Sequence, residues 1–242
     1  MTDSVLILGA GLPDGVGGAL AHRVAREGFH VLVTGRTLEK VEQTAASVRE
    51  HGYDASALAV DVTSESDLDA AFAQLADRGA PVAAVIYNAG NNAIIPFEEL
   101  TAEQFEQFWR LGPYGGFLTA QRAMPILAAQ GGGSMLFTGA SASLRGKPNF
   151  AHFAASKAGL RSLAQSLAKD YGPRGVHVAH VVVDGGINGD RLKTIFPQWL
   201  DQLGDDGSLS PEAIADAFWY LHAQQRSAWT FELDLRPFKE NW

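Results

Sequence analysis

The sequence has no cysteine, few basic residues and no long apolar run, and each absence removes a class of protein. Without cysteine the 242-residue chain has no disulfide framework, no thiolate metal site and no cysteine nucleophile, and we predict no metal. Lys and Arg number 19 against 27 Asp and Glu, so the net charge of -8 argues against nucleic-acid binding, which needs a basic face. No stretch approaches the roughly 18 consecutive apolar residues of a membrane span. These features predict a cytoplasmic protein with neither membrane nor nucleic acid as a partner.

Short apolar runs are the main pattern that is present. Most of them end in glycine or a polar residue, which is typical of strands that a parallel sheet buries on both faces. The ranges that we expect to form such strands are 5–8, 29–34, 57–62, 82–87, 134–138 and 176–183, followed by a half-exposed edge strand at 229–236.

Helical segments lie between these runs. Ser64 and Ser210 are predicted helix N-caps, and the residues 101–104 have the spacing of a capping box. Two long helices are expected at 101–127 and 153–171. Regular strand–helix alternation predicts an α/β fold, a Rossmann-type doubly wound sheet that is mostly parallel, with about seven strands and helices on both faces.

The segment 186–209 has no clear place in such a sheet. Ile195, Phe196 and Trp199 form an apolar cluster there, between Gly189 and Gly204. Late loops of this kind often cover ligands. We therefore expect residues 1–242 to form a single dinucleotide-binding domain, with 186–209 as a lid over a small-molecule substrate.

A glycine-rich turn follows the first expected strand. Gly9, Gly11, Gly15 and Gly17 lie between that strand and a helix. Glycines at this position let a pyrophosphate approach the backbone, and the helix N-terminus favours an anion. The turn therefore predicts dinucleotide binding.

Arg36 stands at the end of the second expected strand, where NAD-binding chains generally carry a carboxylate for the ribose hydroxyls. An arginine there suits the 2′-phosphate of NADP(H), which it can bind through two parallel hydrogen bonds. The alternative is an ordinary solvated surface arginine. The cofactor that we predict is NADP(H).

With these motifs the chain resembles the short-chain dehydrogenase/reductase family along essentially its whole length. Gly11, Gly15 and Gly17 fit the family's glycine spacing, or Gly9 is the first glycine and the loop is two residues longer. Asp61-Val62 matches the family's adenine pair, and the residues 87–90 match its Asn-Asn-Ala-Gly motif in three of four places. The resemblance implies nicotinamide-dependent hydride transfer and a cofactor site made of Gly9, Gly11, Gly15, Val16, Gly17, Arg36, Asp61, Val62, Asn88, Ala89, Gly90, Lys157, Gly185 and Ile187.

The catalytic positions that the resemblance implies are where this chain departs from the family. The family's acid is a tyrosine four residues before a lysine, assisted by a serine 13 residues before that tyrosine and by an asparagine on the preceding helix. Lys157 is kept, but Phe153 stands at the tyrosine position, Ala140 at the serine position with Ser141 beside it, and Gly112 at the asparagine position. Phenylalanine cannot donate a proton, and acid–base assistance is worth about 10²–10⁴ in rate.

Three readings of this departure remain open. In the first, the substrate is an iminium ion that needs no proton from the protein. In the second, a substitute acid donates the proton, and the candidates are His152, Ser141, Tyr114 and Asp184. In the third, the protein binds NADP(H) without turnover and acts as a redox sensor or partner subunit. His152 would point about 100° away from Phe153 on a helix.

A homodimer or homotetramer is also expected, because many relatives associate through the two long helices. The small residues Ala154, Ala155 and Ala158 suit such close packing, but they equally suit burial against the sheet.

Overall fold

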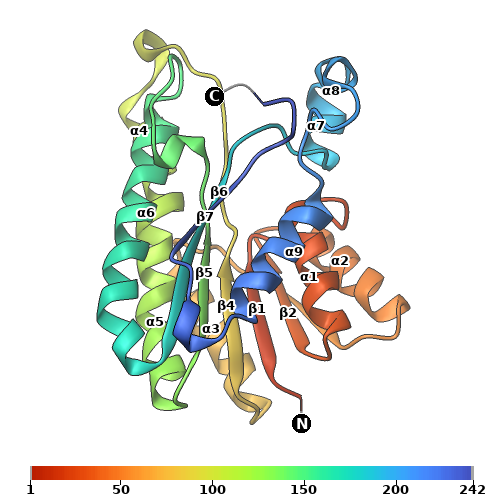
Figure 1. Ribbon diagram of the computed structural model, residues 1–242, viewed down its shortest axis with the longest axis vertical. Coiled ribbons are helices and arrows are strands. Elements are labelled where there is room, and N and C mark those ends of the chain that lie inside the picture. The colour runs from red at the N-terminus through yellow and green to blue at the C-terminus, as the bar shows by residue number, and fades with distance from the viewer. Residues whose placement is uncertain (1, 241–242) are drawn as a thin grey trace.

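Seven parallel strands form the centre of the protein in the computed structural model, which describes residues 2–240 (Figure 1). The sheet order is β3-β2-β1-β4-β5-β6-β7, so the order reverses between β1 and β4. This arrangement confirms the predicted doubly wound fold, and β7 is the predicted edge strand. The strands are β1 (Ser4–Leu8), β2 (His30–Gly35), β3 (Ala55–Ala59), β4 (Val82–Tyr87), β5 (Gly133–Thr138), β6 (Val176–Val183) and β7 (Glu232–Leu235).

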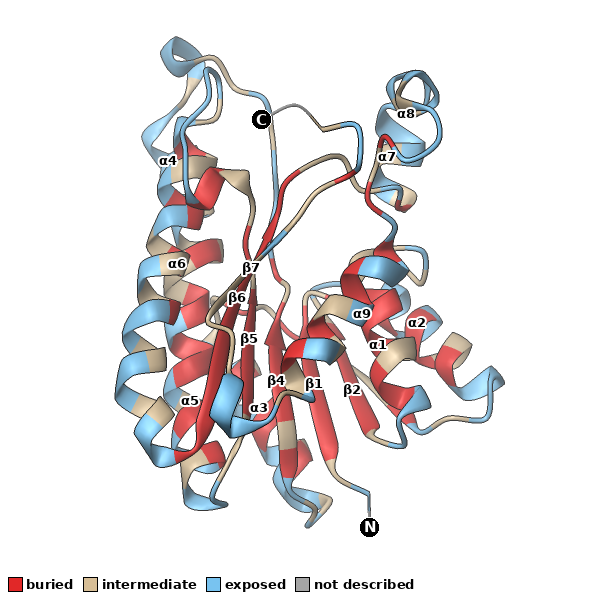
Figure 2. Ribbon diagram, in the orientation of Figure 1, coloured by how far each residue is buried: buried red, intermediate tan, exposed pale blue. Residues whose placement is uncertain are grey.

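Helices cover both faces of the sheet, and each face has its own apolar core (Figure 2). One face carries α1 (Val16–Arg26), α2 (Leu38–Glu50) and α9 (Pro211–His222), and the other carries α3 (Glu65–Asp77), α5 (Gly115–Ala129) and α6 (Ala151–Tyr171).

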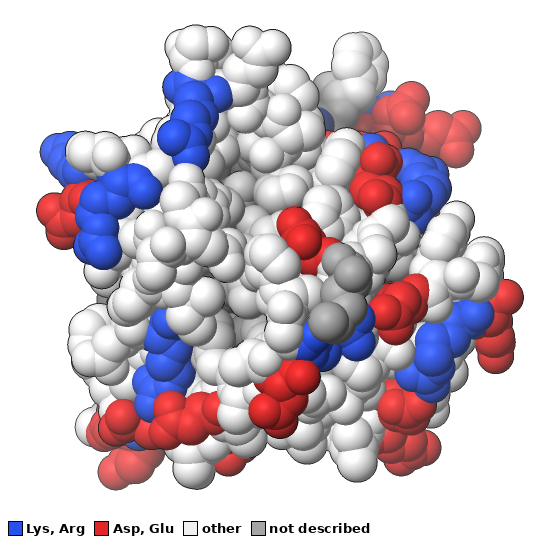
Figure 3. Space-filling view, turned by 90° about the horizontal axis from the view of Figure 1, so that it is seen from below, with Lys and Arg blue, Asp and Glu red and all other residues white. Residues whose placement is uncertain are grey.

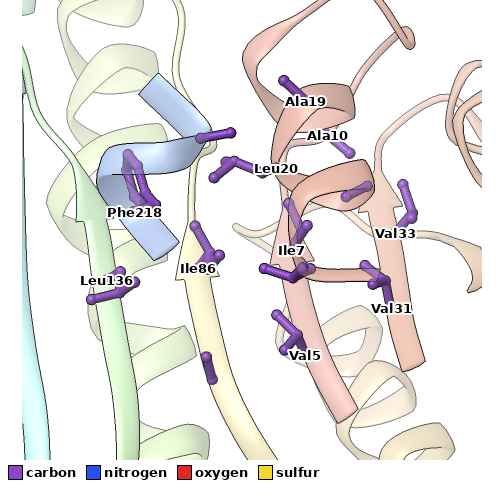
Figure 4. Close-up of a cluster of buried hydrophobic side chains, with 14 of the residues drawn as sticks. Val5, Ile7, Ala10, Ala19, Leu20, Val31, Val33, Ile86, Leu136 and Phe218 are labelled. Atoms are coloured by element: carbon purple, nitrogen blue, oxygen red, sulfur yellow. The ribbon is translucent and has the colours of Figure 1, made fainter. Parts of the chain in front are cut away.

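Figure 4 shows the first of these cores. Leu20 of α1 and Phe218 of α9 reach toward Ile7, Ile86 and Leu136 of the strands, and all five side chains are fully buried. Burying a side chain of this size stabilises the fold by about 1.5–3 kcal/mol. Because β1, β4 and β5 receive side chains from helices on both faces, their sequences are almost continuously apolar, as predicted.

The predicted bounds of β3 are wrong. We expected a strand at 57–62, but the structure places it at Ala55–Ala59. Beyond it, the Asp61 N–H donates to the Asp67 carboxylate at 2.9 Å, and Asp61 Oδ1 accepts the Thr63 N–H at 2.8 Å. These carboxylates bind the backbone groups that a longer strand would have used. Val60 and Val62 stay buried although they follow the strand, which is why the apolar pattern suggested a longer one.

The helix expected at 101–127 is interrupted. The capping box at Thr101 is present and opens α4 (Ala102–Trp109), but a π-helical turn at Arg110–Tyr114 separates α4 from α5. Pro113 in this turn has no N–H to donate. Two side chains satisfy carbonyls that the break frees: Tyr87 Oη donates to Leu111 O at 2.6 Å, and Ser156 Oγ donates to Phe108 O at 2.7 Å. The predicted N-caps Ser64 and Ser210 are both confirmed.

The segment 186–209 leaves the sheet after β6 and returns to a bridge between Ile187 and Leu209. It forms α7 (Asp190–Ile195) and α8 (Pro197–Leu203), which stand beyond the carboxyl ends of the strands (Figure 1). The Arg191 guanidinium donates to Asn91 Oδ1 at 2.9 Å and to the Asn92 carbonyl, so α7 contacts the loop that follows β4.

The opposite end of the molecule carries charges of both signs among other residues. Acidic and basic side chains lie interspersed over the face seen in Figure 3. Among the described residues, no helix is long and apolar enough to cross a membrane.

Candidate active site

The glycine turn lies at the point where the strand order reverses. Gly9 and Gly11 have φ values of +82° and +71°, a region that favours glycine. A Cβ on Gly9 would lie 2.5 Å from the Ala89 Cα, and a Cβ on Gly17 would lie 2.2 Å from the Ala10 Cα. The turn therefore fits closely against the loop after β4 and against its own helix.

The N-terminus of α1 follows this turn directly. Its N-cap is Gly15, which has no side chain to bond the first N–H groups, and its first turn carries no acidic residue. Such an end leaves backbone donors and the positive pole of the helix available to an anion. Asp190 of α7 lies close to this N-terminus, because a Cβ on Gly15 would lie 3.3 Å from its Oδ1.

A cavity of about 220 Å³ opens beside the turn, at the carboxyl ends of β1 and β2. Arg36, Thr37 and Lys40 line it on the β2 side. Neither Arg36 nor Lys40 takes part in the ion pairs found among the described residues, and both are exposed. Arg36 was predicted from the sequence as a site residue, but Lys40 was not: Arg36 precedes the N-cap Thr37, and Lys40 lies in the first turn of α2. The other residues lining the cavity are Gly9, Gly11, Gly35, Val41, Val60, Val62, Ala89, Gly90 and Leu111.

Asn88 connects this cavity to the next strand. Its Nδ2 donates to Gly9 O at 2.8 Å, and its Oδ1 accepts the Thr138 hydroxyl at 2.9 Å. The Thr138 carbonyl in turn accepts from Lys157 Nζ at 2.8 Å. These hydrogen bonds bring the glycine turn, β4, β5 and α6 together at the carboxyl end of the sheet.

Lys157 is 6% exposed, and burial lowers the pKa of its ammonium group to about 8. At neutral pH it is still mostly protonated and has two N–H groups beyond the one bonded to Thr138. Its Nζ lies beside Gly90, where a Cβ would be 3.3 Å from it. The site therefore presents a buried cation next to the cavity.

The three other residues that the resemblance assigns to catalytic positions lie in α6 or beside turns that contact it. The Phe153 ring centroid is 5.9 Å from Lys157 Nζ, and Ala140 precedes the 3-10 turn Ser141–Ser143, which packs against α6. Gly112 lies in the π-helical turn, where a Cβ would be 1.9 Å from Ser156 Oγ. Ser156 thus fills the space that a larger residue at 112 would need.

Three of the four candidate substitute acids make other contacts. His152 is buried against Phe108, with ring centroids 4.2 Å apart, and burial lowers the pKa of its imidazole. Tyr114 stacks on Trp109, and Asp184, only 2% exposed, pairs with Arg145 at 2.7 Å. Ser141, half-buried in its turn, is the fourth candidate.

Asp61 lines the site, whereas Gly185 and Ile187 line neither of its two hollows. Asp61 and Arg36 line a second hollow of about 230 Å³, which shares Leu111 with the first. At Gly185 a Cβ would be 2.6 Å from the Pro237 Cδ, so the residue must stay small. Ile187 packs on the core, as Val16 does, and bridges to Leu209 at the base of the segment 186–209.

The fold and this site together define a class of protein. A parallel sheet that reverses its order beside a glycine turn and a free helix N-terminus is the arrangement of dinucleotide-binding α/β proteins. The profile of the short chain dehydrogenase family matches residues 3–198, and the chain belongs to this family. The family uses nicotinamide cofactors, and the glycine turn, the cavity and the buried Lys157 fit such a group.

Similar proteins agree with this assignment. A short-chain dehydrogenase from Rhodopseudomonas palustris has 34% sequence identity and a TM-score of 0.82, with 98% of this chain and 99% of that chain covered. The oxidoreductase asL5 of Sarocladium schorii is 34% identical over 165 residues, which are 68% of this chain and 65% of that protein. An alcohol dehydrogenase from Thermococcus sibiricus, solved in complex with 5-hydroxy-NADP, shares the fold at 22% identity and a TM-score of 0.83, over 100% of this chain and 99% of its own.

Proposed function

We propose that the protein is an NADP(H)-dependent oxidoreductase that transfers a hydride to or from a small organic carbonyl, imine or alcohol. The observation that supports this proposal is the position of three cations near one cleft at the switch point of the sheet. Arg36 and Lys40, which have no carboxylate partner among the described residues, line the cleft, and the buried Lys157 lies next to it.

Arg36 and Lys40 are the proposed ligands of the 2′-phosphate. A charge-assisted hydrogen bond contributes about 1.5–3 kcal/mol, or roughly ten- to a hundredfold in affinity. Lys157 would hold the nicotinamide ribose, and the glycine turn the pyrophosphate. The complete proposed cofactor site is Gly9, Gly11, Gly15, Val16, Gly17, Arg36, Lys40, Asp61, Val62, Asn88, Ala89, Gly90, Lys157, Gly185 and Ile187.

The proposed reaction runs without a tyrosine acid. Phe153 contributes an apolar ring at that position, so a carbonyl substrate has to take its proton from another group. An iminium ion already carries its proton, and the site is therefore better suited to cyclic imines than to simple ketones. When bound, the dinucleotide supplies the hydride chemistry, and the protein's part is orientation and electrostatics.

The segment 186–209 is the proposed lid over the substrate. Ile195, Phe196 and Trp199 keep about half of their surface exposed on it. Arg191 joins this segment to the loop after β4, across the carboxyl ends of β1 and β4. We also propose that residues 1–242 act as one domain and that the protein assembles as a homodimer or homotetramer in the cytoplasm.

The first test is a pair of calorimetric titrations, one with NADPH and one with NADH. We expect NADPH to bind at least tenfold more tightly, because only NADPH carries the 2′-phosphate. Arg36→Ala and Lys40→Ala should each weaken NADPH binding and leave NADH binding unchanged. Arg174→Ala is the matched control, since this exposed arginine packs on Tyr171, at the other end of the molecule from the cleft.

A turnover panel completes the test, with 2-methyl-1-pyrroline as the imine and acetophenone as the ketone. We expect the imine to be reduced faster. Equal affinities for NADPH and NADH would contradict the assignment of Arg36 and Lys40. Binding of NADPH without conversion of either compound would contradict the oxidoreductase.

A further inference from the structure

The segment 186–209 carries a carboxylate close to the glycine turn. Gly189 is the N-cap of α7 and Asp190 is its first residue, and α7 stands above α1 in Figure 1. A Cβ on Gly189 would lie 3.0 Å from the Asp14 carbonyl oxygen, so the backbone of the segment rests directly on the turn. A Cβ on Gly15 would lie 3.3 Å from Asp190 Oδ1. The Asp190 carboxylate therefore lies beside the N-cap of α1.

The end of α1 beside this carboxylate has free backbone donors. The first backbone bond of the helix runs from the Ala19 N–H to the Gly15 carbonyl at 3.0 Å. Among the described residues, the N–H groups of Val16, Gly17 and Gly18 have no acceptor. Together with the helix dipole, these groups make this end favourable for negative charge. The proposed function places the pyrophosphate of the dinucleotide at the same end.

Asp190 has no cation to compensate its charge among residues 2–240. Its backbone carbonyl accepts the Thr194 hydroxyl at 2.7 Å, but its carboxylate makes neither a hydrogen bond nor an ion pair there. The neighbouring Arg191 donates to Asn91 Oδ1 and to the Asn92 carbonyl instead. The negative charge of Asp190 is therefore balanced mainly by the positive end of α1.

A carboxylate and a pyrophosphate at this end of α1 oppose each other. In the free protein the helix end stabilises Asp190 alone. A bound dinucleotide brings two phosphate groups, each with a negative charge, to the same helix end. Repulsion between like charges a few ångströms apart, partly screened by water, corresponds to about tenfold in affinity.

We propose that Asp190 limits the affinity for the dinucleotide by opposing its pyrophosphate, so that the cofactor leaves quickly between turnovers. The inference rests on the proposed function, because it concerns the same cofactor site. Release steps limit the rate of many enzymes, and an oxidoreductase that uses a free dinucleotide has to exchange its oxidised and reduced forms after every turnover. The segment 186–209 then takes part in cofactor exchange as well as covering the substrate.

Asp190 also lies in the first turn of its own helix, where an acidic side chain is favourable. The two roles predict different results for Asp190→Asn. If the carboxylate only stabilises α7, the variant loosens this helix and binds the dinucleotide no more tightly than the wild type. If the carboxylate opposes the pyrophosphate, the variant binds more tightly, because the amide keeps the shape of the side chain and removes its charge.

Calorimetric titrations of the whole protein with three ligands test the proposal. NADPH and NADH both contain a pyrophosphate, whereas 2′-AMP carries adenine, ribose and the 2′-phosphate without one. We expect Asp190→Asn to bind NADPH and NADH about tenfold more tightly, by the same factor for both, and to bind 2′-AMP as the wild type does. NADPH should also dissociate about tenfold more slowly from the variant in stopped-flow displacement. Sodium chloride at about 1 M, where the screening length is about 3 Å, should remove most of the difference.

Two further variants serve as controls. Asp201→Asn makes the same change of charge at an exposed residue of α8, beyond α7 in Figure 1, and should leave all three affinities at the wild-type values. Asp14 directly precedes Gly15 but is exposed, so water screens its charge and Asp14→Asn should have a smaller effect than Asp190→Asn. A larger effect of Asp14→Asn would assign the repulsion to the turn and overturn the role of Asp190.

The outcomes separate this inference from the proposed function. Unchanged or weaker dinucleotide binding by Asp190→Asn would overturn the inference. An equal gain for 2′-AMP would overturn it too, because the effect would then not act on the pyrophosphate. Equal wild-type affinities for NADPH and NADH, with a gain for both in the variant, would contradict the 2′-phosphate ligands and support the role of Asp190. If neither protein binds either dinucleotide, the proposed function fails, and the inference fails with it.

Discussion

Lys157 is a buried cation, and among residues 2–240 its only hydrogen-bond acceptor is the carbonyl of Thr138. Burying an ammonium group without a carboxylate partner disfavours its charged form, and the lowering of its pKa from 10.5 to about 8 expresses this cost. A residue that destabilises the fold in this way is retained most readily when a ligand uses it. In the proposed function that ligand is the nicotinamide ribose.

We predict that Lys157→Met stabilises the protein while weakening NADPH binding. Below about pH 8 the folded and the unfolded states both carry the proton, so the full cost of burying it is present. Between about 8 and 10.5 the folded state loses its proton first, the cost declines, and above 10.5 it is gone. Urea unfolding near pH 7 should show the variant more stable by roughly 2–3 kcal/mol, after allowance for the lost hydrogen bond.

The same measurement near pH 10 separates this explanation from better packing of methionine. The stability difference should shrink there to a small fraction of its value at pH 7, whereas a packing gain would not depend on pH. Lys169→Met, on the exposed side of the same helix, is the control and should show neither effect. A variant that is less stable than the wild type at pH 7 would contradict the buried-charge argument.

At the scale of elements, the π-helical turn between α4 and α5 leaves little room for a side chain at 112. The turn brings Gly112 against Ser156, whose hydroxyl bonds the Phe108 carbonyl. Tyr87 Oη supports the turn from the sheet side through Leu111 O. π-helical turns often occur at functional sites, and here two side chains from outside the turn stabilise it.

This arrangement predicts that Gly112→Asn destabilises the protein, by about 2–4 kcal/mol, because its Cβ would lie 1.9 Å from Ser156 Oγ. Thermal unfolding of the variant measures the loss. Adding Ser156→Gly should recover part of it by emptying the contested space, and Gly146→Asn, where a Cβ meets no atom, should have little effect. Tolerance of asparagine at 112 without loss of stability would show that the turn can rearrange.

The sequence was sufficient for elements whose residues obey local rules. The buried strands β1 and β4 and the capping box at Thr101 follow from apolar runs and from a side chain that bonds its own helix. The end of β3 and the break after Trp109 did not follow, because they depend on contacts between distant segments. Ser156 and Tyr87 reach the π-helical turn only after the sheet and α6 are in place.

The same distinction between local sequence patterns and contacts of distant segments applies to the candidate site. Consecutive motifs such as Gly9 to Gly17 indicate their position in the fold directly, and the structure places them at the switch point. Lys40 was missed because Arg36 precedes the helix that carries Lys40, so no helical spacing relates the two residues. The hydrogen bonds that join Asn88 to Gly9 and Thr138, and Lys157 to Thr138, connect separate elements, and no spacing in the sequence indicates them.

At the scale of the whole molecule, the outer surface of α4, α5 and α6 carries large apolar side chains. Phe105, Trp109 and Phe117 are 40–45% exposed, and Ala155 and Ala158 of α6 are exposed as well. Ala155 and Ala158 therefore do not pack against the sheet, whereas Ala154, the third residue of the prediction, is half-buried. Apolar and small residues together allow two helices to approach closely.

We predict that this surface joins two copies of the chain. Light scattering at micromolar concentration should give the mass of a dimer or tetramer, as expected for an interface of about 800 Å² per partner. Phe117→Glu should dissociate it, because a buried apolar anchor commonly contributes 2 kcal/mol or more and the carboxylate would be buried without a partner. Tyr220→Glu is the matched control, since Tyr220 is 58% exposed on α9, on the opposite face of the sheet. A monomeric wild type would contradict the assembly, and a Phe117→Glu variant that keeps the wild-type mass would place the interface on another surface.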